Sequence, residues 1–345
     1  MSKYLDQTAL LAYQSAEKAE EERFASRFGL RAAIMQDTNN IPWLTDKLKA
    51  YLRQVQTRDV RIPAIKKDSI TAATVASYNL PLNLPETDYT TLTLNTLMVS
   101  FGIYPEDHEN QHVSKDQILA NRYRECDEAL ALAFEALVNT HLSTYKTQVW
   151  SGDESSEGFI FDEDIDTLQV SLAASKDDTL FAMLQTLANY NNWNGDLAYL
   201  VANPLVGVMY NKIAQYGAGN QKNLLAQTLP QKFESTRVTN TTDARWTAYM
   251  VERGSIGVAP NYTLPFRTQK DVNGGKFDIS DQPLPMLGDR VGLYMEEGAK
   301  ASSINGNMSW VDKYAMVYSF FLLKNYNSSA TTRVGNILKI DALKS

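Results

Sequence analysis

Residues 108–112 read His-Glu-Asn-Gln-His and carry the pattern in this chain most suggestive of chemistry. The form H-E-x-x-H is typical of zinc peptidases, where two His one helical turn apart bind the metal and the Glu polarises a water. That geometry requires both His inside a helix. Here Asn110 and Gln111 are polar, Pro105 lies upstream, and Ser114, the first good helix cap, follows the second His. The sequence therefore favours an approach to a helix over a zinc site.

A third zinc ligand is poorly supplied. The extended pattern H-E-x-x-H-x-x-G-x-x-H would need Gly and His where Lys115 and Ile118 stand. Three carboxylates downstream could serve instead: Glu125, Glu128 and Glu135. They fit the solvated face of a helix equally well. Hydrolysis through His108, Glu109 and His112 is kept as an alternative function, and no catalytic, cofactor-binding or metal residue is assigned.

The remaining reactive side chains fit structural roles. Cys126, the only cysteine, and His141 fall in a predicted helix, where we expect a small core residue and a structural His. Gly217 and Gly219 follow a helix instead of opening one, so they predict a helix end and not a phosphate loop. Ser255, in R-G-S-I-G, has no helix after it and predicts a turn instead of a nucleophile elbow.

Composition is that of an ordinary globular protein. The chain has 345 residues, 44% of them hydrophobic and 21% charged, with a net charge of −7. The acidic balance and the lack of a Lys/Arg cluster argue against a nucleic-acid-binding face. We expect neither a secretory signal nor a membrane span, and a reducing site of folding. The acidic stretch 151–166 predicts a solvated loop.

The elements expected in the first third are extended. Residues 3–28 predict a weak amphipathic helix, and residues 42–55 a short one with Pro42 in its first turn. Residues 58–105 predict two strands joined by a long polar excursion. Loops of that length are uncommon in compact monomers, so we expect another subunit to brace it.

The strongest predicted helix runs from Ser114 to about Gln148. Ser114 to Gln117 has the capping-box form S-x-x-Q, and no Gly or Pro follows before Gly152. At 1.5 Å per residue this helix would span about 50 Å, which implies an elongated molecule.

After this helix, helices and strands alternate. We expect helices at 178–190 and 204–216 on either side of a strand at 197–202. The apolar segment 315–323 predicts a buried strand. Further strands are expected within residues 224–229, 233–240, 245–260, 276–300 and 307–327.

Two short motifs stand within this order: Val201–Pro204, V-A-N-P, which feeds a helix, and Met250–Val258, M-V-E-R-G-S-I-G-V. Together with the element order, they resemble the major capsid protein of tailed bacteriophages, the HK97-like fold shared with encapsulins. The resemblance covers nearly the whole chain and depends on element order. It implies an α+β fold with an N-terminal arm, an extended β-loop, a long spine helix in a peripheral domain, and an α/β axial domain.

The resemblance also implies an organisation and a role. The implied segments are an arm (1–56), an extended loop (57–100), the first part of the peripheral domain with the spine helix (101–174), the axial domain (175–262) and the C-terminal strands of the peripheral domain (263–345). The implied role is a non-enzymatic shell protein without cofactors. It would assemble into pentamers and hexamers of an icosahedral virion capsid around phage double-stranded DNA, after folding in the bacterial cytoplasm.

The implied partners are other copies of the chain, with portal, scaffolding and decoration proteins; DNA is met by non-specific proximity only, and no membrane is involved. One family member cross-links a Lys of its extended loop to a neighbour's Asn. Lys66 and Lys67 lie in the matching region and Asn325 or Asn327 could be partners, but no activating acid is identified. An encapsulin-type compartment and a tail or adaptor component remain alternatives.

Overall fold

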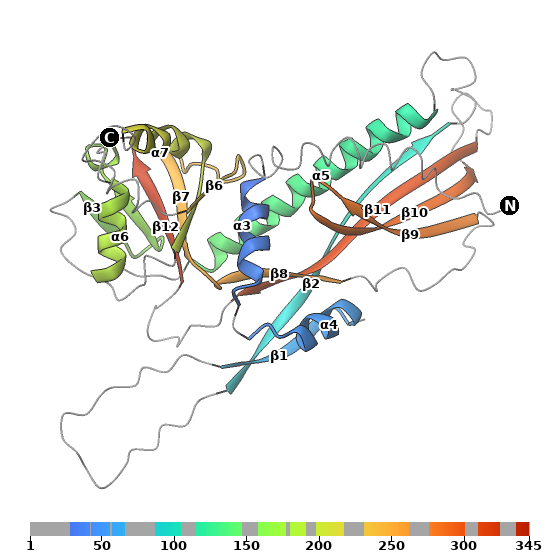
Figure 1. Cartoon of the computed structure of the whole chain (residues 1–345), viewed down its shortest axis with the longest axis horizontal. Helices are drawn as coiled ribbons and strands as arrows, with labels where there is room; N and C mark the ends of the chain where they lie inside the picture. Colours follow the sequence, from blue (N-terminus) through green and yellow to red (C-terminus); the bar gives the residue numbers. More distant parts are fainter. Residues whose placement is uncertain are drawn as a thin grey trace, which may run out of the picture.

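A computed structural model of the chain describes residues 28–41, 43–55, 57–65, 87–104, 115–146, 158–176, 180–190, 198–216, 231–261, 276–300, 310–324 and 336–344. Within these residues the chain is an elongated mixed α/β molecule with two six-stranded sheets. Figure 1 shows one sheet at each end, the long helix α5 (Lys115–Thr144) beside the first, and α3 (Gly29–Thr38) between them.

The first sheet is antiparallel throughout, in the order β1-β2-β11-β10-β9, with β8 also paired to β11. Its strands are β1 (Asp59–Ile65), β2 (Thr87–Ile103), β8 (Ile256–Asn261), β9 (Lys276–Leu284), β10 (Asp289–Lys300) and β11 (Trp310–Lys324). Strand β11 pairs with β2 along one edge and with β10 and then β8 along the other. The prediction of a buried strand at 315–323 is confirmed, because β11 occupies the interior of its sheet.

The second sheet has the order β3-β4-β12-β7-β5-β6, with the β4–β12 and β5–β6 pairs parallel. Its strands are β3 (Phe159–Asp162), β4 (Thr167–Val170), β5 (Ala198–Ala202), β6 (Gln231–Glu234), β7 (Ala244–Glu252) and β12 (Ile337–Leu343). Helices α6 (Leu180–Tyr190) and α7 (Pro204–Tyr216) cover one face, where their apolar residues form a core with Leu200, Met250 and Ile340.

Helix α5 confirms the predicted long helix. It begins one residue after Ser114 and its 30 residues span about 45 Å. The apolar stripe of α5 packs on the first sheet: the Phe134 ring lies 5.0 Å from that of Phe320, and the Tyr123 ring 6.4 Å from that of Tyr314. The predictions for α6, α7 and β5 are also confirmed. Among the helices that the structure describes, none has the length and apolar character that a membrane span requires.

Several local predictions were wrong. Helix α4 (Asp46–Gln54) begins four residues after Pro42, because the Thr45 side chain accepts a hydrogen bond from the backbone N–H of Leu48 and caps it there. Part of the predicted acidic loop is strand β3, whose Phe159 is fully buried in the core below α6. Residues 235–240 lie in turns after β6 instead of continuing a strand, and β12 and helix α3 were not predicted.

Candidate functional site

The predicted zinc motif, residues 108–112, lies outside the described residues, as do Lys66, Lys67, Gly217 and Gly219. Within the residues that are described, no group of three His, Cys, Asp or Glu side chains could hold a metal ion. Cys126 packs in the core as expected, and burial raises the pKa of its thiol to about 11, with the charge of Glu125 adding to the effect. A thiol with that pKa stays protonated at neutral pH and is a poor nucleophile.

Ser255 lies in the turn between β7 and β8, as predicted. A buried carboxylate, that of Asp37 near the end of α3, contacts the same turn. Asp37 is 1% exposed and accepts hydrogen bonds from the backbone N–H groups of three consecutive residues of the turn, Gly254, Ser255 and Ile256. The Tyr199 hydroxyl on β5 donates a fourth, at 3.1 Å. Asp37 therefore fastens the end of α3 to the turn and to the second sheet.

Glu135 on α5 fastens the other end of α3. Its carboxylate is fully buried and accepts from the backbone N–H of Leu30 at 2.9 Å and of Arg31 at 3.2 Å. The Ser235 hydroxyl, after β6, donates at 2.7 Å. The expectation that Glu135 lies on a solvated helix face was wrong. Its carboxylate lies at the start of α3 and satisfies backbone donors that the side chain of Phe28, the N-cap residue of α3, does not cap.

A third buried carboxylate on α5 ties the first sheet to the helix. Asp127 accepts from the backbone N–H groups of Met286 at 2.8 Å and Leu287 at 2.9 Å, in the turn between β9 and β10. The Arg31 guanidinium donates to the Met286 carbonyl of the same turn. Helices α3 and α5 and two turns from distant parts of the chain thus meet through carboxylates that bind backbone N–H groups.

These carboxylates have a structural and not a catalytic environment. Burial raises the pKa of Asp37 and of Glu135, and their hydrogen bonds act in the opposite direction. Raised carboxyl pKa values are frequent at active sites. Here, however, the oxygens of Asp37 and Glu135 are directed at backbone donors of the fold. We infer that this cluster, which we call the α3 junction (Asp37, Asp127 and Glu135 with their backbone partners), holds the two sheets in a fixed arrangement.

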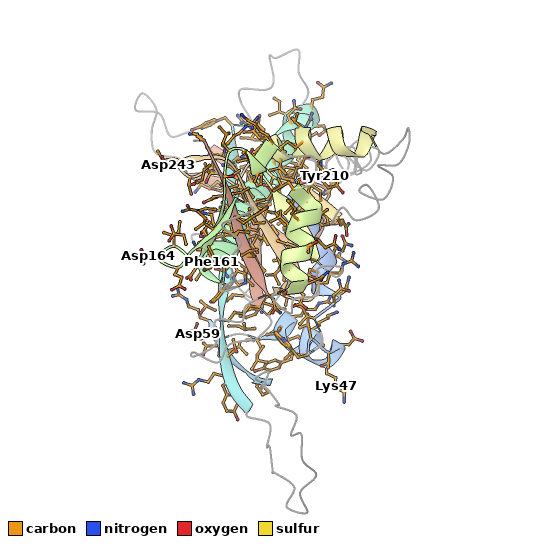
Figure 2. All side chains as sticks on the ribbon, turned by 90° about the vertical axis from the view of Figure 1, so that its left-hand side faces the viewer. Lys47, Asp59, Phe161, Asp164, Tyr210 and Asp243 are labelled. Carbon is orange, nitrogen blue, oxygen red and sulfur yellow. The ribbon has the colours of Figure 1, made fainter. Side chains whose placement is uncertain are left out.

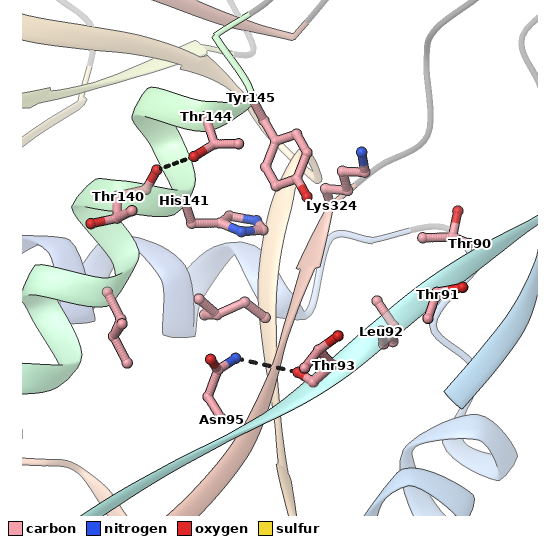
Figure 3. Close-up of a pocket in the computed structure, with 12 residues that line it drawn as sticks. Thr90, Thr91, Leu92, Thr93, Asn95, Thr140, His141, Thr144, Tyr145 and Lys324 are labelled. Atoms are coloured by element: carbon pink, nitrogen blue, oxygen red, sulfur yellow. Dashed lines mark hydrogen bonds between the residues drawn. The ribbon is translucent and has the colours of Figure 1, made fainter. Parts of the chain in front are cut away.

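A pocket of about 260 Å³ lies between the end of α5, strand β2 and strand β11 (Figure 3). Threonines of β2 and α5 line much of it, with His141, Tyr145 and Lys324 at one end. The His141 Nε2 lies 3.2 Å from the Leu323 carbonyl oxygen, to which it donates, and its ring contacts Tyr145 at 4.7 Å. His141 thus ties α5 to β11.

The charges in this pocket do not form an acid–base pair. Burial lowers the pKa of His141 to about 4, an effect that the Leu323 hydrogen bond opposes and nearby Lys324 reinforces. The Lys324 Nζ lies 3.8 Å from the centre of the Tyr145 ring, and burial lowers the pKa of Lys324. His141 is therefore neutral at pH 7 and already hydrogen-bonded to the backbone.

The most unusual surface of the described chain is the ribbon formed by β1 and the first half of β2. Residues 59–65 of β1 pair with residues 87–93 of β2, and Figure 1 shows this ribbon projecting from the body beside α4. One face is covered: Val60, Ile62 and Leu92 are buried in a core with α4. The opposite face is exposed, including Tyr89, whose exposed fraction is 69%.

No protein-family model matches the chain, and no curated protein matches its sequence. Solved structures are similar to it at low identity. A chain of Mycobacterium phage Che8 is 12% identical with a TM-score of 0.49, over 88% of this chain and 90% of that one. A chain of the capsid of Cyanophage P-SCSP1u is 12% identical with a TM-score of 0.44, over 85% and 86%. A chain of the mature capsid of bacteriophage PhiM1 is 12% identical with a TM-score of 0.44, over 85% and 84%.

Proposed function

We propose that this chain is a major capsid protein with an HK97-like fold, which assembles into an icosahedral shell around a phage double-stranded DNA genome. The observation that carries the proposal is the β1–β2 ribbon. A two-stranded ribbon is marginally stable alone in water. This one has an apolar face covered by α4 and a second face, with Tyr89, that the described residues leave open. A neighbouring copy lying on that face would complete it.

The arrangement of the rest of the molecule supports the same proposal. Helix α5, packed along β2 and β11, would be the spine of the peripheral domain, and the ribbon its extended loop. The second sheet with α6 and α7 would be the axial domain. On the same criterion of strand pairing, we propose that residues 159–170 and 337–343 belong to the axial domain with 175–252, and that β8, which pairs with β11, belongs to the peripheral domain.

A structural role also accounts for the buried polar groups. The carboxylates of the α3 junction bind backbone N–H groups that join distant segments. Such contacts suit a rigid unit that must repeat the same shape in every position of a shell. The net charge of −7 suits the wall of a DNA container, because a wall that is not basic does not trap packaged phosphates.

Copies of the same chain are the primary partners in this proposal, as pentamers and hexamers in the virion. Portal, scaffolding and decoration proteins would bind secondarily, and the subunit would fold in the host cytoplasm before assembly. An encapsulin-type compartment has the same architecture and differs in its contents. Its shell would hold a protein cargo instead of a genome.

Negative-stain electron microscopy of the purified full-length chain, with sedimentation of the same sample, tests the proposal. We expect closed shells, or pentameric and hexameric rings. A chain that stays monomeric over a wide range of protein and salt concentrations would overturn it. Zinc measured in the same preparation decides the remaining alternative: stoichiometric metal that is lost in the His112→Ala variant would favour a hydrolase.

A further inference from the structure

We propose that neighbouring copies of this chain meet head to tail through the second sheet, with the outer surface of α7 on one copy against the β3–β4 hairpin of the next. This inference rests on the proposed function, because it names the surfaces by which subunits of a ring would touch. Two apolar pairs on opposite sides of the same sheet carry it.

The first pair lies on α7. Leu205 and Val208 are 53% and 70% exposed, although both are large apolar residues. Residues three apart share a helix face, so the two side chains form one patch. Val206, between them, is fully buried in the core of the second sheet. The patch therefore lies on the face of α7 directed away from its own sheet.

The second pair lies on the β3–β4 hairpin. Ile160 and Ile165 are 55% and 45% exposed. Strand β3 alternates, so Phe159 enters the core below α6 while Ile160 points to the opposite face of the sheet. Ile160 stands opposite Gln169 in the pairing with β4, in a polar row that α6 and α7 do not cover. Strand β3 is also an edge strand of the sheet.

The two patches face opposite sides of the molecule. Figure 2 shows Phe161 and Asp164, on the hairpin, on one side and Tyr210, on α7, on the other. One copy cannot bring its own two patches together, so any contact between them joins two copies. A contact between unlike surfaces is heterologous, and repeated by rotation it closes a ring.

Charge favours this pairing over a contact of like with like. The hairpin carries four carboxylates within residues 162–166, and Lys146 reaches its backbone at the Ile165 carbonyl. Two such hairpins would therefore repel each other. The carboxylate beside the first turn of α7, that of Glu234 next to Gly207, is already paired with the Lys232 ammonium.

Cysteine cross-linking of the full-length chain tests the proposal. The variant carrying both Ile160→Cys and Val208→Cys is treated with a short bifunctional maleimide under conditions in which particles form. We expect a ladder of covalent oligomers beyond the dimer on a denaturing gel. The two single variants and the wild-type chain, whose only thiol is the buried Cys126, serve as matched controls and should give no ladder.

Charge substitution gives a second readout on the same surface. Val208→Asp would place a carboxylate against the acidic hairpin and should lower the yield of particles on the order of tenfold or more. Val208→Lys removes the same apolar side chain but should lower the yield less, because the hairpin attracts it. Circular dichroism and the urea midpoint of each variant report folding. Because Val208 lies on an exposed helix surface, neither substitution should change the circular dichroism spectrum or the urea midpoint.

The outcomes separate this inference from the proposed function. Particles that form without the ladder, or equal losses for the two charge variants, would overturn the head-to-tail contact and leave the capsid proposal standing. Dimers formed equally by Val208→Cys alone would indicate a two-fold contact and also overturn it. A wild-type chain that never assembles would remove the proposed function itself.

Discussion

Removing the Asp37 carboxylate should destabilise the subunit severely. In Asp37→Ala the N–H groups of Gly254 and Ile256 and the Tyr199 hydroxyl each lose their acceptor in a buried site. The Ser255 N–H retains the Glu252 carbonyl. Each buried donor left without a partner costs about 1–3 kcal/mol. The wild-type carboxylate itself is costly to bury, as its raised pKa indicates, and this offsets part of the loss. We expect a net loss of about 3 kcal/mol.

Urea unfolding followed by tryptophan fluorescence measures this loss, at a protein concentration where the chain sediments as a monomer. The matched control is Asp59→Ala, an exposed carboxylate that accepts one hydrogen bond from Thr93, with an expected change of about 0.5 kcal/mol or less. Asp37→Asn keeps one oxygen acceptor and should fall between Asp37→Ala and wild type. Amide exchange at Gly254 and Ile256 should accelerate in Asp37→Ala. A loss below about 1 kcal/mol, with unchanged exchange, would refute the role assigned to this carboxylate.

Three further substitutions probe other parts of the fold. The pKa of His141 is lowered to about 4 in the folded state, so the stability that its neutral form contributes is present above about pH 6.5 and is lost as the pH falls toward 4. The substitution His141→Gln should therefore remove up to about 3 kcal/mol of the pH dependence of the unfolding free energy. Urea midpoints measured between pH 4.5 and 7.5 test this. Phe134→Ala should cost about 3–5 kcal/mol by leaving a cavity between α5 and β11, and an unchanged thermal midpoint would contradict the packing described. Gly254→Ala should lower the free energy of unfolding by about 2 kcal/mol, because Gly254 has a φ of +81° and a new Cβ would lie 2.6 Å from the Asn40 carbonyl oxygen. Equal urea midpoints for the variant and the wild type would show that the turn can relax.

The sequence predicted the elements whose signals are local. The apolar stripe of α5 and the unbroken apolar run of β11 repeat along one segment, so periodicity alone indicates them. The same holds for the V-A-N-P turn before α7, where the Asn203 side chain accepts from the Leu205 N–H and caps the helix. Each of these elements is specified by residues that are neighbours in the chain.

The missed elements depend on distant residues. Helix α3 has no side-chain cap of its own, because Glu135 supplies the acceptor from 105 positions away. Strand β12 contains Lys339 and Asp341, residue types that usually lie at the surface. Both are buried here, with the Lys339 Nζ 2.9 Å from the Asp341 carboxylate. The acidic residues after Phe159 favoured a solvated loop, so the short strand β3 was not predicted. A carboxylate buried by tertiary contacts looks the same in sequence as a solvated one, so the α3 junction could not be predicted.

The place of β12 in the second sheet bears on when the subunit can fold. This strand lies between β4 and β7, yet it follows both in the chain, and its parallel pairing with β4 joins Lys339 to Thr167 across more than half of the described sequence. During synthesis the sheet lacks an interior strand until residue 343 has left the ribosome. Contacts of such long sequence separation form slowly. The half of the subunit that bears α7 and the β3–β4 hairpin is therefore completed last. In the proposed shell, one copy could join the next through these surfaces only after its own translation had ended.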